Sequence, residues 1–330
     1  IHLSDVPDGP VTGYAVFGAV GRFPYVMVLD IHGHRVWARQ PYVDGRSLSV
    51  DPFLRGLQHQ DGNLLLAFTA RGSGTNGYAA IFKLNISSGT TIGSRVFGGN
   101  YSTYVRAIRE VEGNYVIAGY RTFYGCLAVP DFWVAKLSAS LGVLAQNSYG
   151  DGCLAYDDER AVAVVQTSSG FMLAGTKDNR TWVVETDAAL QQTRGRQFNG
   201  VIAYDIAPSG DGFILDELSG SWMTLQRLDA AGDPVWRTDY RDPPIGRAWR
   251  FVPAADGGFI GTGSASGGAW VTKLGPEGTL TTDPGVVVPV DPDTGQTPVS
   301  VDFPLVIKPG TTSVEIVDST SDTPPPNFRF

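Results

Sequence analysis

Short apolar runs, each introduced by turn-forming residues, recur along most of the chain. The run DGNLLLAF (61–68) returns in weaker copies as EGNYVIAG (112–119), SGFMLAGT (169–176), DGFILDEL (211–218) and DGGFIGTG (256–263). An apolar run of this length behind a Gly-containing turn predicts a β-strand. The turn glycines are spaced about 42–57 residues apart, a period typical of β-propeller blades; they are Gly62, Gly113, Gly170, Gly212 and Gly257.

A second apolar run accompanies these and ends mostly in Lys-Leu or Leu-Asp. Its copies are YVMVLD (25–30), AIFKLN (80–85), WVAKLS (133–138), WVVETD (182–187), LQRLD (225–229) and WVTKL (270–274). With an approach strand before the first run and a fourth strand after the second, each repeat predicts a four-stranded antiparallel sheet. So small a sheet must bury its faces against neighbouring copies.

On these motifs the chain resembles the secreted and cell-surface β-propeller repeat proteins. The best matches are RAVAVVQTSSGFMLAG (160–175), DFWVAKLSASLGVLAQNSYGDG (131–152) and GAWVTKLGPEGTL (268–280), and the resemblance spans about 14–283. It implies an architecture and says little about activity, because repeats of this kind occur in proteins of many functions.

We therefore expect an all-β protein, a six-bladed β-propeller of four-stranded antiparallel blades over residues 1–284. The expected blades are 1–50, 51–102, 103–158, 159–202, 203–246 and 247–284, followed by a C-terminal extension, 285–330. The first and last repeats are incomplete, so Ile1–Val6 or part of the extension is expected to supply a missing strand. Trp37 and Trp236, in LDIHGHRVW and LDAAGDPVW, are interpreted as blade-to-blade packing rather than as contacts to a cofactor.

Composition and charge narrow the function. With 41 Gly, 21 Pro and only 18% charged residues, the chain favours short strands over long helices. Its net charge of −8, with scattered Lys and Arg, argues against nucleic acid as a partner.

No apolar run is long enough for a membrane helix, and Ile1 stands where an initiator Met would be, so we expect an extracellular or cell-surface protein that has lost a leader. Three Asn-x-Ser/Thr triplets are candidate glycosylation sites: Asn85, Asn100 and Asn179.

The two cysteines fall in loops that the predicted meander brings to one end of a blade. Cys126 lies between the second and third strands, and Cys153 lies in the exit to the next blade. A disulfide between them would close a loop of roughly 27 residues and stabilise the fold by about 3–4 kcal/mol in an oxidising compartment. The alternative is two free thiols.

The same end carries the longest predicted loops, where binding sites are commonly found. A ligand-binding face is therefore expected there, with solvated loops as the alternative; its candidate residues are Tyr120, Arg121, Phe123, Tyr124, Asp157 and Asp158. Innermost strands carry Arg55, Arg106 and Arg250, which could line a central channel and bind an anion. Carboxylates from adjacent blades could equally neutralise these arginines.

The extension is rich in Pro, Val, Thr and Asp. VSVDFPLVI (299–307) and TSVEIVD (312–318) alternate as strands do, and such a strand could add to the sheet edge of another copy. Docking on its own ring is the alternative. The candidate assembly residues are Val299, Val301, Phe303, Val306, Val314 and Ile316.

No catalytic constellation emerges from the sequence. His32 and His34 lack a third ligand, DPDTG (291–295) lacks the terminal Glu of a calcium loop, and no phosphate-binding loop occurs. We expect no cofactor, with calcium a weak candidate. The favoured function is a non-catalytic extracellular structural or adhesive propeller that self-associates into a filament or layer through its terminal strands. A carbohydrate- or ligand-binding propeller is the alternative, and a propeller hydrolase or lyase is a third.

Overall fold

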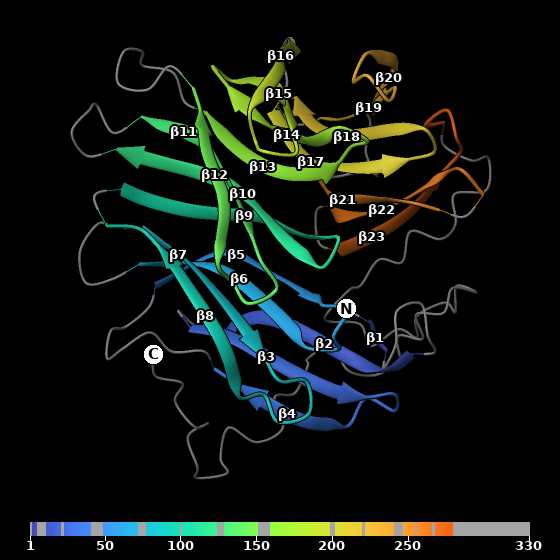
Figure 1. The fold of residues 1–330 in the computed structure, drawn as a ribbon. Helices are drawn as coiled ribbons and strands as arrows, with labels where there is room; N and C mark the ends of the chain where they lie inside the picture. Colours follow the sequence, from blue (N-terminus) through green and yellow to red (C-terminus); the bar gives the residue numbers. More distant parts are fainter. Residues whose placement is uncertain are drawn as a thin grey trace. The chain divides into compact units, whose positions relative to one another are not determined.

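A computed structural model of the chain describes residues 2–4, 11–20, 23–40, 49–71, 77–99, 101–123, 129–150, 159–198, 202–219, 222–240, 247–254, 256–265 and 268–279. Every regular element in this part of the chain is a β-strand, and each sheet is an antiparallel meander of consecutive strands (Figure 1). The expected fold class, an all-β six-bladed β-propeller, is confirmed. The C-terminal extension, with its two expected strands, lies outside the described residues.

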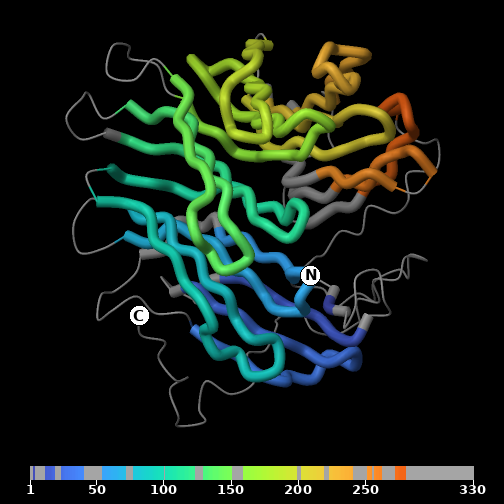
Figure 2. Tube along the Cα trace, in the orientation of Figure 1, coloured from blue at the N-terminus to red at the C-terminus, as the bar shows by residue number. Residues whose placement is uncertain are grey.

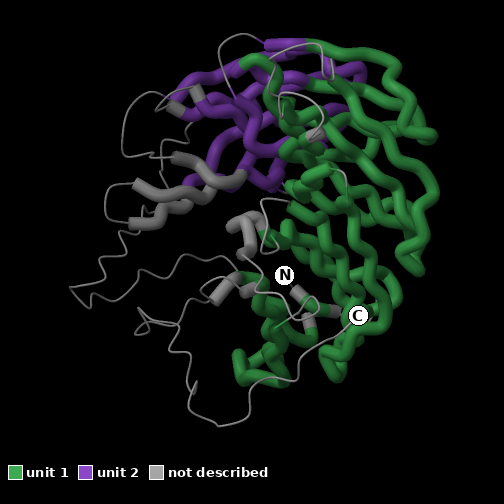
Figure 3. Tube along the Cα trace, turned by 90° about the vertical axis from the view of Figure 1, so that its left-hand side faces the viewer, with its two compact units in different colours: residues 1–178, 183–196, 324–330 green, residues 179–182, 197–323 purple. Residues whose placement is uncertain are grey.

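The described residues form two compact units (Figure 3). The first holds those up to residue 178 together with 183–196, and the second holds 179–182 and those from 197 onward. The first unit contains the first three sheets and most of the fourth. The start of β15 belongs to the second unit, together with the fifth and sixth sheets.

The sheets of the first unit follow one another along the chain, and Figure 2 traces each as an up-and-down path. The first sheet is β1 (His2–Ser4), β2 (Val11–Val20), β3 (Phe23–Asp30) and β4 (Arg35–Arg39). The second is β5 (Ser49–Gln58), β6 (Leu64–Arg71), β7 (Gly77–Leu84) and β8 (Thr91–Phe97). The third is β9 (Tyr101–Val111), β10 (Asn114–Phe123), β11 (Pro130–Leu137) and β12 (Val143–Tyr149). The fourth is β13 (Arg160–Gln166), β14 (Gly170–Lys177), β15 (Arg180–Asp187) and β16 (Gln192–Phe198).

The second unit contains the remaining described strands. Its fifth sheet is β17 (Ile202–Ser209), β18 (Gly212–Ser219), β19 (Trp222–Leu228) and β20 (Pro234–Tyr240). The sixth has three described strands, β21 (Arg247–Pro253), β22 (Phe259–Ala265) and β23 (Gly268–Leu274).

The N-terminal stretch supplies the first strand of the first sheet. His2 pairs with Tyr14, and Leu3 with Gly13, in antiparallel register. Leu3 is buried in the core shared by the first and second sheets. This is one of the two solutions expected for the weak first repeat.

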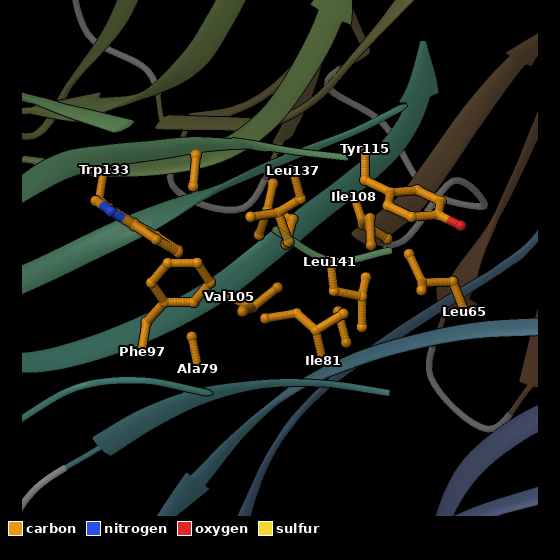
Figure 4. Packing of buried hydrophobic residues seen from close by; sticks show 13 residues of the cluster. Leu65, Ala79, Ile81, Phe97, Val105, Ile108, Tyr115, Trp133, Leu137 and Leu141 are labelled. Atoms are coloured by element: carbon orange, nitrogen blue, oxygen red, sulfur yellow. The ribbon is translucent and has the colours of Figure 1, made fainter. Parts of the chain in front are cut away.

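Neighbouring sheets bury their faces against each other, as the repeat requires. Between the second and third sheets, Phe97 meets Trp133 edge-on with 4.9 Å between ring centroids, and Ile81 and Val105 lie in the same cluster (Figure 4). Trp133 is completely buried. Burying a large side chain of this kind contributes on the order of 2–3 kcal/mol, so these interfaces hold each unit together.

The turns between the third and fourth strands of the sheets share several features. In three sheets an aspartate carboxylate accepts two backbone N–H bonds across the turn, from residues two and four positions on; these are Asp30, Asp187 and Asp229. The turn closes on a residue with positive φ, usually glycine, the residue type that adopts this conformation without strain. Leu141 (φ 66°) and Leu190 (φ 63°) take this position in two sheets, and both side chains are buried.

In the described part of the chain, four outer strands reach the next sheet through this turn: β4, β8, β12 and β20. Trp37 Nε1 donates to the carbonyl of Ile86 at 2.6 Å, and Arg95 Nε donates to the carbonyl of Leu141 at 2.9 Å. Asn147 and Tyr149 both donate to the carbonyl of Leu190. In the second unit, the Tyr240 hydroxyl donates to the carbonyl of Gly278, and Trp236 packs edge-on against Phe259. Trp37 and Trp236 therefore pack between adjacent sheets, as interpreted from the sequence.

Candidate functional site

A cluster of charged and aromatic side chains, some exposed and some buried, lies at one end of the sheets of the first unit. In an antiparallel meander, the start of the first strand and the end of the second lie at the same end. Arg71 is the last residue of β6, Tyr104 is near the start of β9, Tyr120 is near the end of β10, and Arg160 begins β13. The topology therefore brings side chains from three sheets to the loop end that the sequence analysis singled out.

Two stacked tyrosines form the centre of this cluster. Tyr104 and Tyr120 are cross-strand partners on β9 and β10, and their rings are nearly parallel, with centroids 4.4 Å apart. Gly77 on β7 leaves room for Tyr104, because a Cβ there would lie 2.9 Å from its ring. The Gly77 N–H donates to Ser102 Oγ at 2.9 Å, which fixes this close approach. The pair is thus held from both the second and the third sheet.

Three arginines surround the tyrosine pair. The guanidinium carbon of Arg71 lies 5.8 Å from the Tyr104 ring centroid, and those of Arg106 and Arg160 each lie 5.3 Å from the Tyr120 centroid. Arg106 Nη2 also donates to the Tyr120 hydroxyl at 3.1 Å. Arg71 and Arg160 are exposed. We call Tyr104, Tyr120, Arg71, Arg106 and Arg160 the arginine–tyrosine cluster.

A fourth arginine lies over aromatic rings at the same end of the third sheet. Arg121 follows Tyr120 on β10, so its side chain is on the opposite face. Its guanidinium carbon lies 4.8 Å from the Trp133 ring and 5.5 Å from the Tyr101 ring, and its Nη2 donates to Gln146 Oε1. Burial lowers the pKa of Arg121, although Tyr101 acts in the opposite direction. The group remains a cation because arginine titrates far above neutral pH.

The structure brings together residues from two separate sequence predictions. Arg55 Nε donates to the backbone carbonyl of Arg106 at 3.0 Å, so two of the three proposed channel arginines are in contact. Arg106 in turn contacts Tyr120, which was assigned to the loop face. Arg250 is in the second unit, where its backbone pairs with Thr262.

Other predicted residues are only partly described, or not at all. Phe123 pairs through its backbone with Tyr101 at the end of β10. The cysteines, four other candidates and the assembly residues lie outside the described ranges; besides Cys126 and Cys153 they are Asn100, Tyr124, Asp157, Asp158, Val299, Val301, Phe303, Val306, Val314 and Ile316. The disulfide and the assembly strands therefore stay predictions.

Of the candidate glycosylation sites, Asn85 and Asn179 are described. The Asn85 side-chain oxygen accepts bonds from the backbone N–H groups of Ser87 and Ser88, which caps the turn after β7. Asn179 is exposed in the turn between β14 and β15. Asn179 is the more exposed of the two asparagines, so it is the better candidate for glycosylation.

A buried acidic pair in the second unit was not recognised as a candidate from the sequence. Asp216 and Glu217 occupy β18 where other repeats carry apolar or small residues, and Glu217 is fully buried. Burial raises the pKa of Glu217 to about 7, with Asp239 adding to the effect and Thr181 and Arg237 opposing it. Burial, with the charges of Asp205 and Glu217, also raises the pKa of Asp216 well above its usual value. The two acidic residues are visible in the sequence as the Asp-Glu of DGFILDEL (211–218), in a run that is otherwise apolar after its turn.

A buried histidine occupies the opposite end of the second and third sheets. His59 Nδ1 lies 2.8 Å from Asp61 Oδ1, and its Nε2 lies 3.5 Å from Glu110 Oε1. Lys83 Nζ lies 2.6 Å from Asp61 Oδ2 and also donates to a backbone carbonyl of the third sheet. Partial burial acts to raise the pKa of Asp61, but hydrogen bonds, chiefly from Lys83, hold it well below its usual range. This network joins the two sheets.

The described residues do not form a metal site. No group of three or more His, Cys, Asp or Glu side chains in this part of the chain is placed to hold a metal ion. Glu159, which follows the candidate residues Asp157 and Asp158 in the sequence, is buried, and its Oε1 lies 2.8 Å from Lys177 Nζ. The same described ranges include no helix long and apolar enough to cross a membrane.

Comparison with known proteins identifies the fold alone. No protein-family model matches the sequence, and no curated protein matches it. Among solved structures, the Dos1 propeller is similar at a TM-score of 0.52 and 14% identity over 78% of this chain; the match covers 64% of the Dos1 chain, less than two thirds of its length. A Bacteroides fragilis protein provisionally assigned as a 6-phosphogluconolactonase is similar at a TM-score of 0.53 and 11% identity, over 82% of this chain and 80% of its own. An apocarotenoid oxygenase of Synechocystis is similar at a TM-score of 0.45 and 10% identity, over 82% of this chain and 70% of its own. At 14% identity or less, the two similarities with a TM-score above 0.5 show the fold of this chain and nothing of its activity.

Proposed function

We propose that the protein is a non-catalytic extracellular propeller with an adhesive function, which holds its ligand at the arginine–tyrosine cluster. The observation that carries this proposal is the meeting of Arg71, Arg106 and Arg160 around one stacked tyrosine pair. Three sheets contribute to the cluster, so the rigid scaffold fixes its geometry. Such preorganisation favours binding because few side chains must be ordered when a ligand arrives.

Binding accounts for these groups better than catalysis does. Arginine titrates far above neutral pH, so the cluster offers fixed cations and hydrogen-bond donors rather than a group that exchanges protons. Glu217 has a pKa suited to general acid–base chemistry, but it is fully buried and cannot meet a substrate in this conformation. Release of reducing ends from a polysaccharide panel would contradict the non-catalytic part of the proposal.

Assembly through the C-terminal extension is the second part of the proposal, and the sequence pattern of residues 299–318 is what supports it. Deleting residues 299–330 is expected to leave a soluble monomer, whereas the full chain forms oligomers by light scattering. Unchanged assembly of the deletion variant would contradict this part and leave the ligand site unaffected.

The binding proposal is tested on an array of neutral and acidic glycans. Wild-type protein is expected to bind, and a variant carrying Arg71→Gln and Arg160→Gln is expected to lose that binding. Arg35→Gln is the matched control, since Arg35 is exposed on an outer strand of the same unit. Equal binding by the double variant would contradict the proposed site.

A further inference from the structure

The aromatic contacts of arginine are concentrated at one end of the first unit. Although the chain carries a net charge of −8, four arginines stack on Tyr or Trp rings there: Arg71, Arg106, Arg121 and Arg160. They come from β6, β9, β10 and β13. A local group of cations favours anions as ligands.

Stacking presets how these arginines can bind. A guanidinium held against a ring keeps its planar set of five N–H donors, whose geometry matches a carboxylate. Arg106 is fixed further by the Tyr120 hydroxyl, and its backbone carbonyl is bound by Arg55. Because each fork has several donors, it can bind a ligand oxygen in addition to its protein contacts.

The three arginines of the cluster come from three different sheets. Arg106 and Arg160 are both 5.3 Å from the Tyr120 ring centroid, so they are at most twice that distance apart. Arg71 extends the group across the stacked Tyr104 to the second sheet. An extended ligand with repeated anionic groups can contact all three cations at once.

An exposed aromatic ring at the same end favours a sugar polymer. Tyr101, at the start of β9, is 38% exposed and lies beside Arg121 on the face of the third sheet opposite to Tyr120, so a ligand that contacts both must extend across this end of the sheet. An exposed tyrosine ring provides an apolar face and a hydroxyl, which suits an amphipathic sugar ring. We therefore infer, on the basis of the proposed binding function, that the ligand is an acidic polysaccharide whose carboxylates pair with Arg71, Arg106 and Arg160.

The test measures binding of the full chain to polygalacturonate and to the same polymer after carboxyl reduction. Wild-type protein should bind the acidic polymer, with an affinity that falls as salt rises, and should bind the reduced polymer at least about tenfold more weakly. Arg71→Gln with Arg160→Gln should weaken polygalacturonate binding at least about tenfold, and Arg35→Gln should not.

Arg106→Lys separates charge from geometry. Lysine keeps the cation but lacks the planar fork, so the variant should also bind more weakly, with an unchanged circular dichroism spectrum and melting temperature. If this variant bound as tightly as wild type, the inference that the planar guanidinium group of Arg106 pairs with a carboxylate would be wrong.

Three other outcomes are decisive. Equal binding of the acidic and the reduced polymer would overturn the inference while leaving the proposed function intact, as would array binding to neutral glycans that still depends on Arg71 and Arg160. Equally tight binding of polyglutamate would overturn it too, because the cluster would then recognise charge without sugar. Failure to bind any glycan would overturn both.

Discussion

Replacing Glu217 by glutamine should stabilise the protein at neutral and alkaline pH and leave its stability near pH 4.5 almost unchanged. Glu217 is fully buried on β18, and burial raises its pKa from 4.5 to about 7. Glutamine has the same shape but no charge, so the variant removes the ionisation and keeps the packing. Asp216 is present in both proteins, so most of its own contribution cancels in the comparison.

The sign follows from the order of the two pKa values. Below pH 4.5 the carboxyl group is protonated in both the folded and the unfolded state. Between pH 4.5 and about 7 only the unfolded state loses the proton, so the free energy of unfolding falls as pH rises. Each pKa unit corresponds to about 1.4 kcal/mol, so the full loss reaches up to about 3 kcal/mol above pH 7.

Urea unfolding followed by tryptophan fluorescence, at pH 4.5, 6 and 8, measures this difference. The gain of Glu217→Gln over wild type should grow with pH, at an unchanged dependence on urea concentration. Glu277→Gln is the matched control, because Glu277 is exposed in the same unit. A difference between Glu217→Gln and wild type that is the same at pH 4.5 and pH 8 would refute the assignment of a buried, protonated carboxyl group.

Three further predictions concern stability and are checked by urea unfolding. Gly89→Ala should cost about 1–3 kcal/mol more than Gly33→Ala: both sites have positive φ, but a Cβ at Gly89 would lie 2.8 Å from a buried tryptophan whereas Gly33 has open space. Tyr149→Phe should cost about 1 kcal/mol, because it removes a 2.7 Å hydrogen bond to the next sheet's turn while a second donor to that carbonyl remains. Lys83→Met should destabilise the protein at pH 7, and the loss should shrink as pH falls below the usual aspartate pKa of 3.8, because the lowered pKa of Asp61 stabilises the fold only where the carboxyl group is ionised.

The sequence predicted the fold well where the repeat reflects local chemistry. Alternating apolar runs behind Gly turns marked the strands, and DFWVAKLSASLGVLAQNSYGDG indeed forms β11 and β12. Asp30 and Asp229 marked turns because a carboxylate that accepts two backbone N–H bonds acts within four residues. Leu141 and Leu190 do not follow the turn pattern, since their buried side chains stabilise a conformation that favours glycine.

The candidate site was less predictable because it depends on contacts between sheets. Tyr120, Arg121 and Arg106 were singled out, but as members of two different sites. Tyr104 and Arg160 were missed, because a cross-strand stack and a cation above it are set by register and by the neighbouring sheet. The buried Glu217 could have been found by comparing DGFILDEL with its apolar counterparts.

The bonds from four outer strands to the following turns show that unlike copies of the repeat can be joined in the same way. The donors vary, from Trp37 to Arg95 to Tyr149, yet the acceptor is always a main-chain carbonyl. A substitution changes a side chain and leaves the peptide oxygen in place. The acceptor of each of these hydrogen bonds is therefore present whatever the residue. Any side chain with a hydrogen-bond donor of suitable reach can therefore join one sheet to the next.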